Sequence, residues 1–140
     1  MAIFHDKKIL VLLMVLFITT GCAGMERQKI EVDKRSDSGV YEEFKVINKI
    51  KNVSDVKDIL QKAEWENRKV DMEREADYQF IFQFMNPDIE AKAILYSIWI
   101  GPEKDTLEVV AGDNQYVHLN KENSNKLFET ITESKLADIE

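Results

Sequence analysis

The chain has one cysteine, and the residues around it give its thiol a defined chemical setting. Cys22 directly follows Gly21, and an unbroken apolar run of ten residues, 9–18, ends shortly before them. Lys7 and Lys8 precede that run. A thiolate is the strongest nucleophile that a protein side chain offers. An apolar run of this length spans roughly half of a ~30 Å hydrocarbon core, so it predicts a secretory signal rather than a transmembrane helix.

The rest of the chain offers few groups for catalysis or metal binding. His118 is the one histidine that follows the apolar run, and Glu108 on the preceding predicted strand is its candidate partner. We interpret His118 as a surface strand residue, because general catalysis needs a partner fixed beside it. The acidic stretch 64–77 has no glycine, which a calcium loop needs for its turn. We therefore expect no enzyme activity, no metal and no cofactor.

The charge balance narrows the range of partners. The 140 residues carry a formal net charge of −7 without a basic cluster, which argues against nucleic-acid binding. Residues 1–21 contain one acidic residue, Asp6, and two basic ones, so without them the net charge of −7 becomes −8. Such a surface is repelled by anionic lipid headgroups. Contact with a membrane would therefore depend on a covalent lipid.

The pattern after the cysteine predicts a tether and then one domain. Residues 23–39 carry only scattered apolar side chains, so we expect Cys22 and a flexible tether to cover 22–39. From residue 40 onward the pattern is periodic, which predicts a single globular domain over 40–140. A strand is expected near 44–50, and a helix over about 54–64 with Asn52 or Ser54 as its cap.

Four strands and a second helix account for the rest of the predicted domain. Period-two alternation places strands at 78–85, 91–100, 106–111 and 115–119, before a helix capped by Asn120 or Ser124. Short connections make these four strands an antiparallel meander. The predicted fold is α+β, a two-layer sandwich with a mostly antiparallel sheet of about five strands and two helices, in the order β-α-β-β-β-β-α.

The two strongest strands predict one buried face and one mixed face. The buried set is Tyr78, Phe80, Phe82 and Phe84, with Ile94, Tyr96, Ile98 and Ile100 on the neighbouring strand. The opposite face carries Ile81, Leu95 and Trp99, which we interpret as a candidate exposed binding patch. Two alternatives remain: residues 25–43 cover this patch, or Trp99 is a half-buried strand residue. An exposed Trp99 predicts that Trp99→Ala costs about 1 kcal/mol and Phe82→Ala about 3–5 kcal/mol.

The segment that ends at Cys22 resembles the lipobox signal of bacterial lipoproteins. In that family a Gly or Ala precedes an invariant Cys that is diacylated on sulfur, and Gly21 and Cys22 match those positions. Thr19 stands where the family usually has Leu. The resemblance implies a signal peptide over 1–21, cleavage between Gly21 and Cys22, and a palmitate-type anchor on the extracytoplasmic face of the cell membrane. The alternative is a plain secretory signal that happens to contain a cysteine.

Residues 44–131 resemble the YhfM-like domain of small lipoproteins from bacilli. The resemblance rests on Asp77-Tyr78 at the start of a strand, on Tyr96-Ser97-Ile98-Trp99-Ile100, and on Tyr116-x-x-Leu119 before the helix that contains Leu127. Ala76 stands where the family usually has Pro. The resemblance implies a location and a fold, and it leaves the mechanism open.

The sequence therefore predicts a lipid-anchored extracytoplasmic lipoprotein whose domain binds an envelope partner or a ligand. One alternative is an envelope-polymer hydrolase, which needs two carboxylates roughly 5–9.5 Å apart in a cleft. The other is an immunity- or inhibitor-type lipoprotein that blocks another protein at the membrane.

Overall fold

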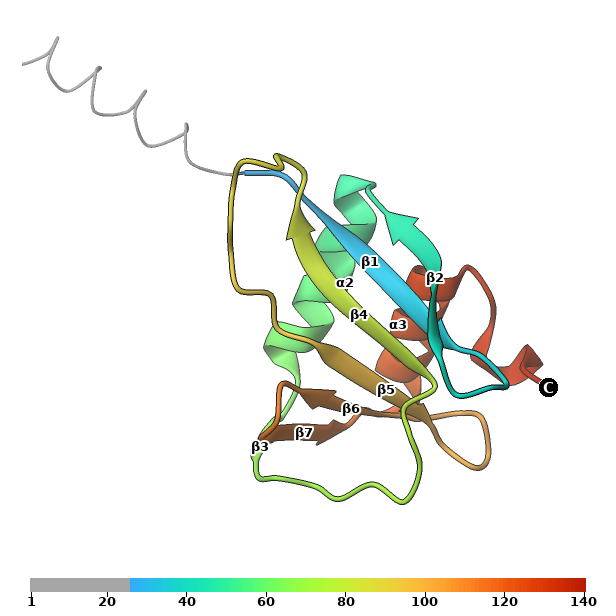
Figure 1. Cartoon of the computed structure of the whole chain (residues 1–140). Helices are drawn as coiled ribbons and strands as arrows, with labels where there is room; N and C mark the ends of the chain where they lie inside the picture. Colours follow the sequence, from blue (N-terminus) through green and yellow to red (C-terminus); the bar gives the residue numbers. More distant parts are fainter. Residues whose placement is uncertain (1–25) are drawn as a thin grey trace, which may run out of the picture.

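A computed structural model describes residues 26–140, in which two helices cover one face of an antiparallel β-sheet (Figure 1). The expected signal peptide, with Gly21 and Cys22, lies outside the described residues. The helices are α2 (Ile50–Lys62) and α3 (Lys121–Thr132), followed by the short 3-10 helix η1 (Leu136–Asp138). The strands are β1 (Gln28–Arg35), β2 (Tyr41–Ile47), β3 (Glu66–Asn67), β4 (Tyr78–Phe84), β5 (Tyr96–Ile100), β6 (Leu107–Ala111) and β7 (Gln115–His118). None of the helices within 26–140 is long and apolar enough to cross a membrane.

The sheet confirms the predicted α+β class and the predicted meander. Its seven strands run in the order β2-β1-β4-β5-β6-β7-β3, and each neighbouring pair is antiparallel. The strands β4 to β7 are consecutive neighbours, as their short connections predict. The number of strands is larger than the predicted five, because the analysis of the sequence missed β1 and the two-residue β3.

The predicted tether is wrong from Gln28 onward, because β1 lies inside the sheet between β2 and β4. Ile30 and Val32 are fully buried, and charged residues alternate with them along the strand. A strand with one buried face needs apolar side chains only at every second position. The folded domain therefore begins near Gln28 rather than at residue 40, and residues 23–27 alone separate Cys22 from the sheet.

The two long helices begin differently. α2 starts one turn earlier than predicted, with Lys49 at its N-cap and no side-chain cap, so Asn52 and Ser54 lie within the helix. The earlier start lets Val53 join Val56 on the buried face. In α3 the predicted cap is confirmed for Asn120, whose side-chain oxygen accepts a hydrogen bond from Asn123 N at 2.8 Å.

Ser124, the other candidate cap, joins α3 to the sheet instead. Its side chain is fully buried inside the helix, and its Oγ accepts a hydrogen bond from Leu107 N at 2.9 Å. The same hydroxyl donates to Leu119 O at 3.2 Å. A buried hydroxyl with both roles satisfied fixes the helix against the start of β6.

The core lies between the helices and the inner face of the sheet. Tyr78 is buried there, and its ring contacts Phe128 and Phe44 edge to face at centroid distances of 5.6 and 5.7 Å. The predicted inward face of β4 is confirmed for Tyr78 and Phe80, whereas Phe82 and Phe84 are only partly buried. The predicted strand 91–100 is shorter than expected, because β5 begins at Tyr96 and residues 91–95 belong to the preceding connection.

Candidate functional site

The predicted outer patch does not exist as an exposed cluster. Trp99 is only 9% exposed, and its Nε1 donates a hydrogen bond to Arg74 O at 2.8 Å. Leu95 is 43% exposed but precedes β5, and Ile81 is partly buried on β4. The interpretation of Ile81, Leu95 and Trp99 as a binding patch is therefore wrong, because another segment covers the tryptophan.

The covering segment is the connection between β3 and β4, and Asp77 fixes it to β5. One carboxylate oxygen of Asp77 accepts from the Arg74 guanidinium at 2.7 Å, and the other accepts from Ile100 N at 2.7 Å. Arg74 also donates to Ile100 O at 2.9 Å. The hydrogen bond from Asp77, more than any other contact, raises the pKa of Arg74. We call Arg74, Asp77 and Trp99 the Trp99 cluster. Its residues join the β3–β4 connection to β5.

His118 is an exposed residue of strand β7, as predicted. Its Nε2 lies 3.1 Å from Thr106 Oγ1. Glu108 is its direct neighbour in the β6–β7 register, but the Glu108 carboxylate accepts a hydrogen bond from the Tyr116 hydroxyl. Burial, together with this hydrogen bond, raises the pKa of Tyr116 to about 12. The histidine and its candidate partner carboxylate thus lie side by side without a hydrogen bond between them in the described structure.

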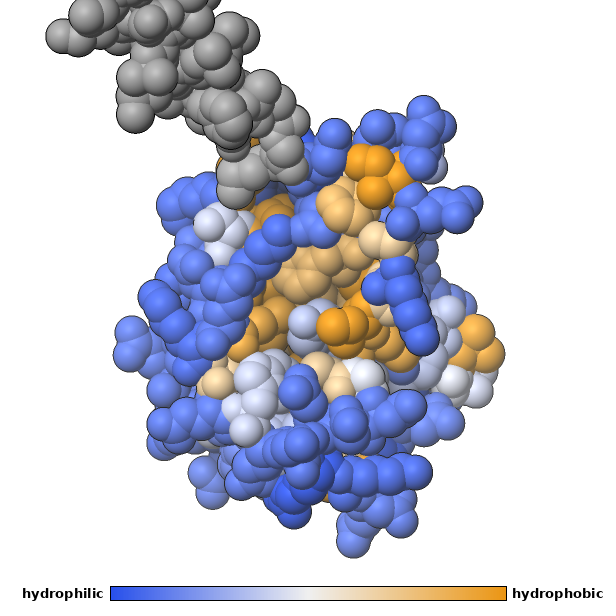
Figure 2. Space-filling view, turned by 90° about the vertical axis from the view of Figure 1, so that its left-hand side faces the viewer, coloured by the Kyte–Doolittle hydropathy of each residue, from blue (hydrophilic) through white to orange (hydrophobic). Residues whose placement is uncertain are grey.

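An open hollow lies on the inner face of the sheet, between the C-terminal half of α2 and the strands. Figure 2 shows it as an apolar depression surrounded by a hydrophilic rim. Its volume is about 320 Å³. Ten side chains from α2, the sheet and the connections line it, and we call it the apolar groove: Gln28, Lys57, Leu60, Gln61, Trp65, Phe82, Ile94, Tyr96, Ala111 and Gln115.

Aromatic contacts fix the rings of the groove. The Tyr96 ring stacks on the ring of the buried Phe80, with 4.9 Å between the ring centroids. It contacts the Phe82 ring edge to face at a centroid distance of 5.9 Å. The ring centroids of Trp65 and Tyr96 lie 6.4 Å apart, and Trp65 Nε1 donates a hydrogen bond to Leu60 O at 2.7 Å. Burial raises the pKa of Tyr96. Since Phe82, Tyr96 and Trp65 remain partly exposed, the groove presents rigid apolar surface to the solvent.

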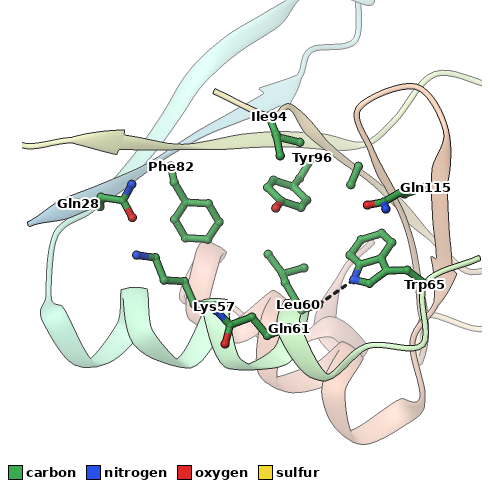
Figure 3. Close-up of a pocket in the computed structure, with 10 residues that line it drawn as sticks. Gln28, Lys57, Leu60, Gln61, Trp65, Phe82, Ile94, Tyr96 and Gln115 are labelled. Carbon is green, nitrogen blue, oxygen red and sulfur yellow. Dashed lines mark hydrogen bonds between the residues drawn. The ribbon is translucent and has the colours of Figure 1, made fainter. Parts of the chain in front are cut away.

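The groove is elongated, with polar groups at both ends (Figure 3). Gln28 and Lys57 lie at one end, and Trp65 and Gln115 at the other. Lys57 Nζ lies 5.6 Å from the centre of the Phe82 ring. No carboxylate is among the lining residues. The arrangement can hold an extended apolar group and place a polar group at one end.

Sequence reasoning missed this site because its residues come from separate elements. Trp65 is the one aromatic residue in the charged stretch 64–77, and an aromatic side chain among charged ones was the sequence feature that pointed to this site. Lys57 lies in a helix with an ordinary amphipathic pattern, which gives no sign of a ligand. Within residues 26–140, no group of three or more His, Cys, Asp or Glu side chains is arranged to hold a metal ion.

Comparison with known proteins gives one family. The family model described as YhfM protein matches residues 25–137. No curated protein and no solved structure matches the chain. The matched range begins before β1 and ends inside η1, so it includes the whole sheet, both long helices, the Trp99 cluster and the apolar groove.

Proposed function

Since the chain belongs to the YhfM protein family, we propose that it is a lipid-anchored, extracytoplasmic binding protein whose ligand site is the apolar groove. The observation that carries the proposal is the group of three partly exposed aromatic side chains, Phe82, Tyr96 and Trp65, around a hollow of about 320 Å³. Ligand sites are typically concave, mostly apolar and largely pre-formed.

Burial of the ring faces supplies the free energy for binding. Each Å² of apolar surface that a ligand removes from water contributes about 25 cal/mol. The rings of Phe82 and Tyr96 already have fixed orientations, so little side-chain entropy is lost when a ligand binds. The lining without carboxylates favours binding over the hydrolysis of envelope polymers, which needs an acidic pair facing the substrate.

The anchor would hold the groove close to the membrane. Cys22 is separated from Gln28 by residues 23–27, and a chain of this length reaches about 20 Å when fully extended. Gln28 itself lines the groove. A ligand that partitions into the bilayer would therefore be concentrated near the site.

The anchor is tested with Cys22→Ser in the full-length chain. We expect the variant to lose labelling by a fatty-acid analogue and to remain as uncleaved precursor. Ser38→Ala, in the turn between β1 and β2, serves as the matched control and should behave as wild type. If wild type and Cys22→Ser have the same lipid label and mass, the proposed anchor is wrong.

The groove is tested with the uncharged fluorescent probe N-phenyl-1-naphthylamine and residues 22–140 carrying Cys22→Ser. This chain contains every strand, both helices and the whole core cluster of the described structure. We expect saturable probe fluorescence that Phe82→Gln reduces at least fivefold in affinity. Ile81→Gln changes the neighbouring residue on the opposite face of β4 and should retain binding. Equal binding by both variants, or no saturable binding by either, would contradict the proposed site.

A further inference from the structure

The charge of the apolar groove differs from that of the chain as a whole. The chain has 26 acidic and 19 basic residues, yet Lys57 is the one charged side chain in the lining. Three of the other lining residues are glutamines. An apolar site with a single cation is complementary to a ligand with a single anionic group.

Lys57 is available for such a group. Within residues 26–140 no carboxylate lies within ion-pair distance of its Nζ, which lies 5.6 Å from the centre of the Phe82 ring. By contrast, Lys51 on the same helix is paired with Asp55 at 3.1 Å. An ammonium beside an apolar surface forms stronger hydrogen bonds with an anion than the same group surrounded by water.

The length of the groove fits an unbranched chain. Figure 3 places Lys57 at one end and Trp65 at the other, with Phe82 and Tyr96 between them. An apolar cavity of about 150 Å³ accommodates benzene, which has six carbons, so about 320 Å³ accommodates roughly twelve.

We infer that the apolar groove binds a single-chain carboxylate, a fatty acid, with its carboxylate at Lys57 and its chain along Phe82 and Tyr96 toward Trp65. This inference rests on the proposed function, because it names the ligand class of the same groove. The carboxylate end lies beside Gln28, the first residue of β1.

The test compares amphiphiles that share a twelve-carbon chain and differ in head-group charge. Laurate and dodecyltrimethylammonium, both below their micellar concentrations, are titrated at pH 8 by calorimetry into residues 22–140 carrying Cys22→Ser. We expect laurate to bind at least fivefold more tightly, and its advantage to shrink at high salt. Lys57→Gln should bring the two affinities within about twofold. Lys51→Gln, on the same helix with a side chain 85% exposed, should keep the preference.

Two results overturn the inference. One is equal binding of the two amphiphiles by the wild type, and the other is an unchanged laurate preference in a Lys57→Gln variant with native circular dichroism. If N-phenyl-1-naphthylamine still binds in either case, the groove is a ligand site that does not recognise the head group, and the proposed function stands. If neither the amphiphiles nor the uncharged probe binds, the proposed function fails together with the inference.

Discussion

The Trp99 cluster and the apolar groove each contain a tryptophan with the same kind of hydrogen bond, but the two rings differ in their exposure to solvent. In each, a tryptophan Nε1 donates to a backbone carbonyl: Trp99 to Arg74 O at 2.8 Å, and Trp65 to Leu60 O at 2.7 Å. Trp99 is nevertheless buried, whereas Trp65 borders an open hollow. Satisfying the indole N–H fixes the ring, but the connection that passes over it decides whether the ring meets water.

The two connections differ in how they are held. The segment over Trp99 is fixed by Asp77, which binds both the Arg74 guanidinium and Ile100 N. The segment 85–95 beside the groove is joined to other elements near its two ends, by Met85 N to Arg27 O at 2.8 Å and by Gly112 N to Leu95 O at 2.9 Å. Between these two hydrogen bonds, no backbone hydrogen bond joins the segment to another element of the described structure, and Ile94, which lines the groove, is 55% exposed.

The largest expected effect of a substitution comes from removing the buried ring. Trp99→Ala should lower the free energy of unfolding by about 3–5 kcal/mol, because it leaves a cavity and an unpaired Arg74 carbonyl. Phe82→Ala should cost about 1–2 kcal/mol, since its ring is already partly in water. This order is the reverse of the one that the sequence predicts. Chemical denaturation of both variants measures these losses of unfolding free energy. A smaller loss for Trp99→Ala than for Phe82→Ala would show that the β3–β4 connection does not bury Trp99.

Removing the carboxylate that fixes the cover should have the next largest effect. Asp77→Ala leaves Ile100 N without its partner and should cost about 1–3 kcal/mol of unfolding free energy. Glu75→Ala, an exposed neighbour, should stay within about 0.5 kcal/mol of wild type. Denaturation curves followed by Trp99 fluorescence in a Trp65→Phe background give both values. Equal curves for the two variants would mean that Asp77 does not hold the connection.

The two tryptophans should also differ in their accessibility to solutes. With Trp65 as the sole tryptophan, in Trp99→Phe, acrylamide should quench fluorescence strongly, and a groove ligand should protect it. With Trp99 as the sole tryptophan, in Trp65→Phe, quenching should be weak and unchanged by ligand. Trp65→Phe should cost about 1 kcal/mol of stability, the value of one hydrogen bond. Similar quenching constants in the two variants would remove the distinction between covered and open rings.

A further effect is expected at alkaline pH, where the hydroxyl of Tyr116 on β7 loses its proton. The pKa of Tyr116 is raised to about 12, above its value near 10 in the unfolded chain. Its contribution to stability is therefore complete below pH 10 and is lost as the pH rises toward 12. Tyr116→Phe should flatten this part of the stability profile relative to wild type. An unchanged slope between pH 10 and 12 would assign the alkaline loss to other tyrosines.

The success of sequence analysis followed the strength of local patterns. The aromatic alternation of β4 and the turn residues between β5, β6 and β7 were enough to predict the meander. β1 was missed because its charged outer face, with Lys29, Glu31 and Asp33, hides the two buried positions. The apolar groove was beyond prediction, because Lys57, Trp65 and Tyr96 meet only after α2 packs across the sheet.

The position of β1 also bears on the order in which the strands can pair as the chain folds. β1 and β2 are neighbours in the sequence and can pair as a hairpin, but the other edge of β1 stays unpaired until β4, which ends at Phe84, joins it. A long unpaired edge is a template for aggregation, and charged side chains at such an edge oppose pairing with another chain. The alternating charges of β1 are thus suited to protecting the folding chain for the interval in which one edge of this strand has no partner.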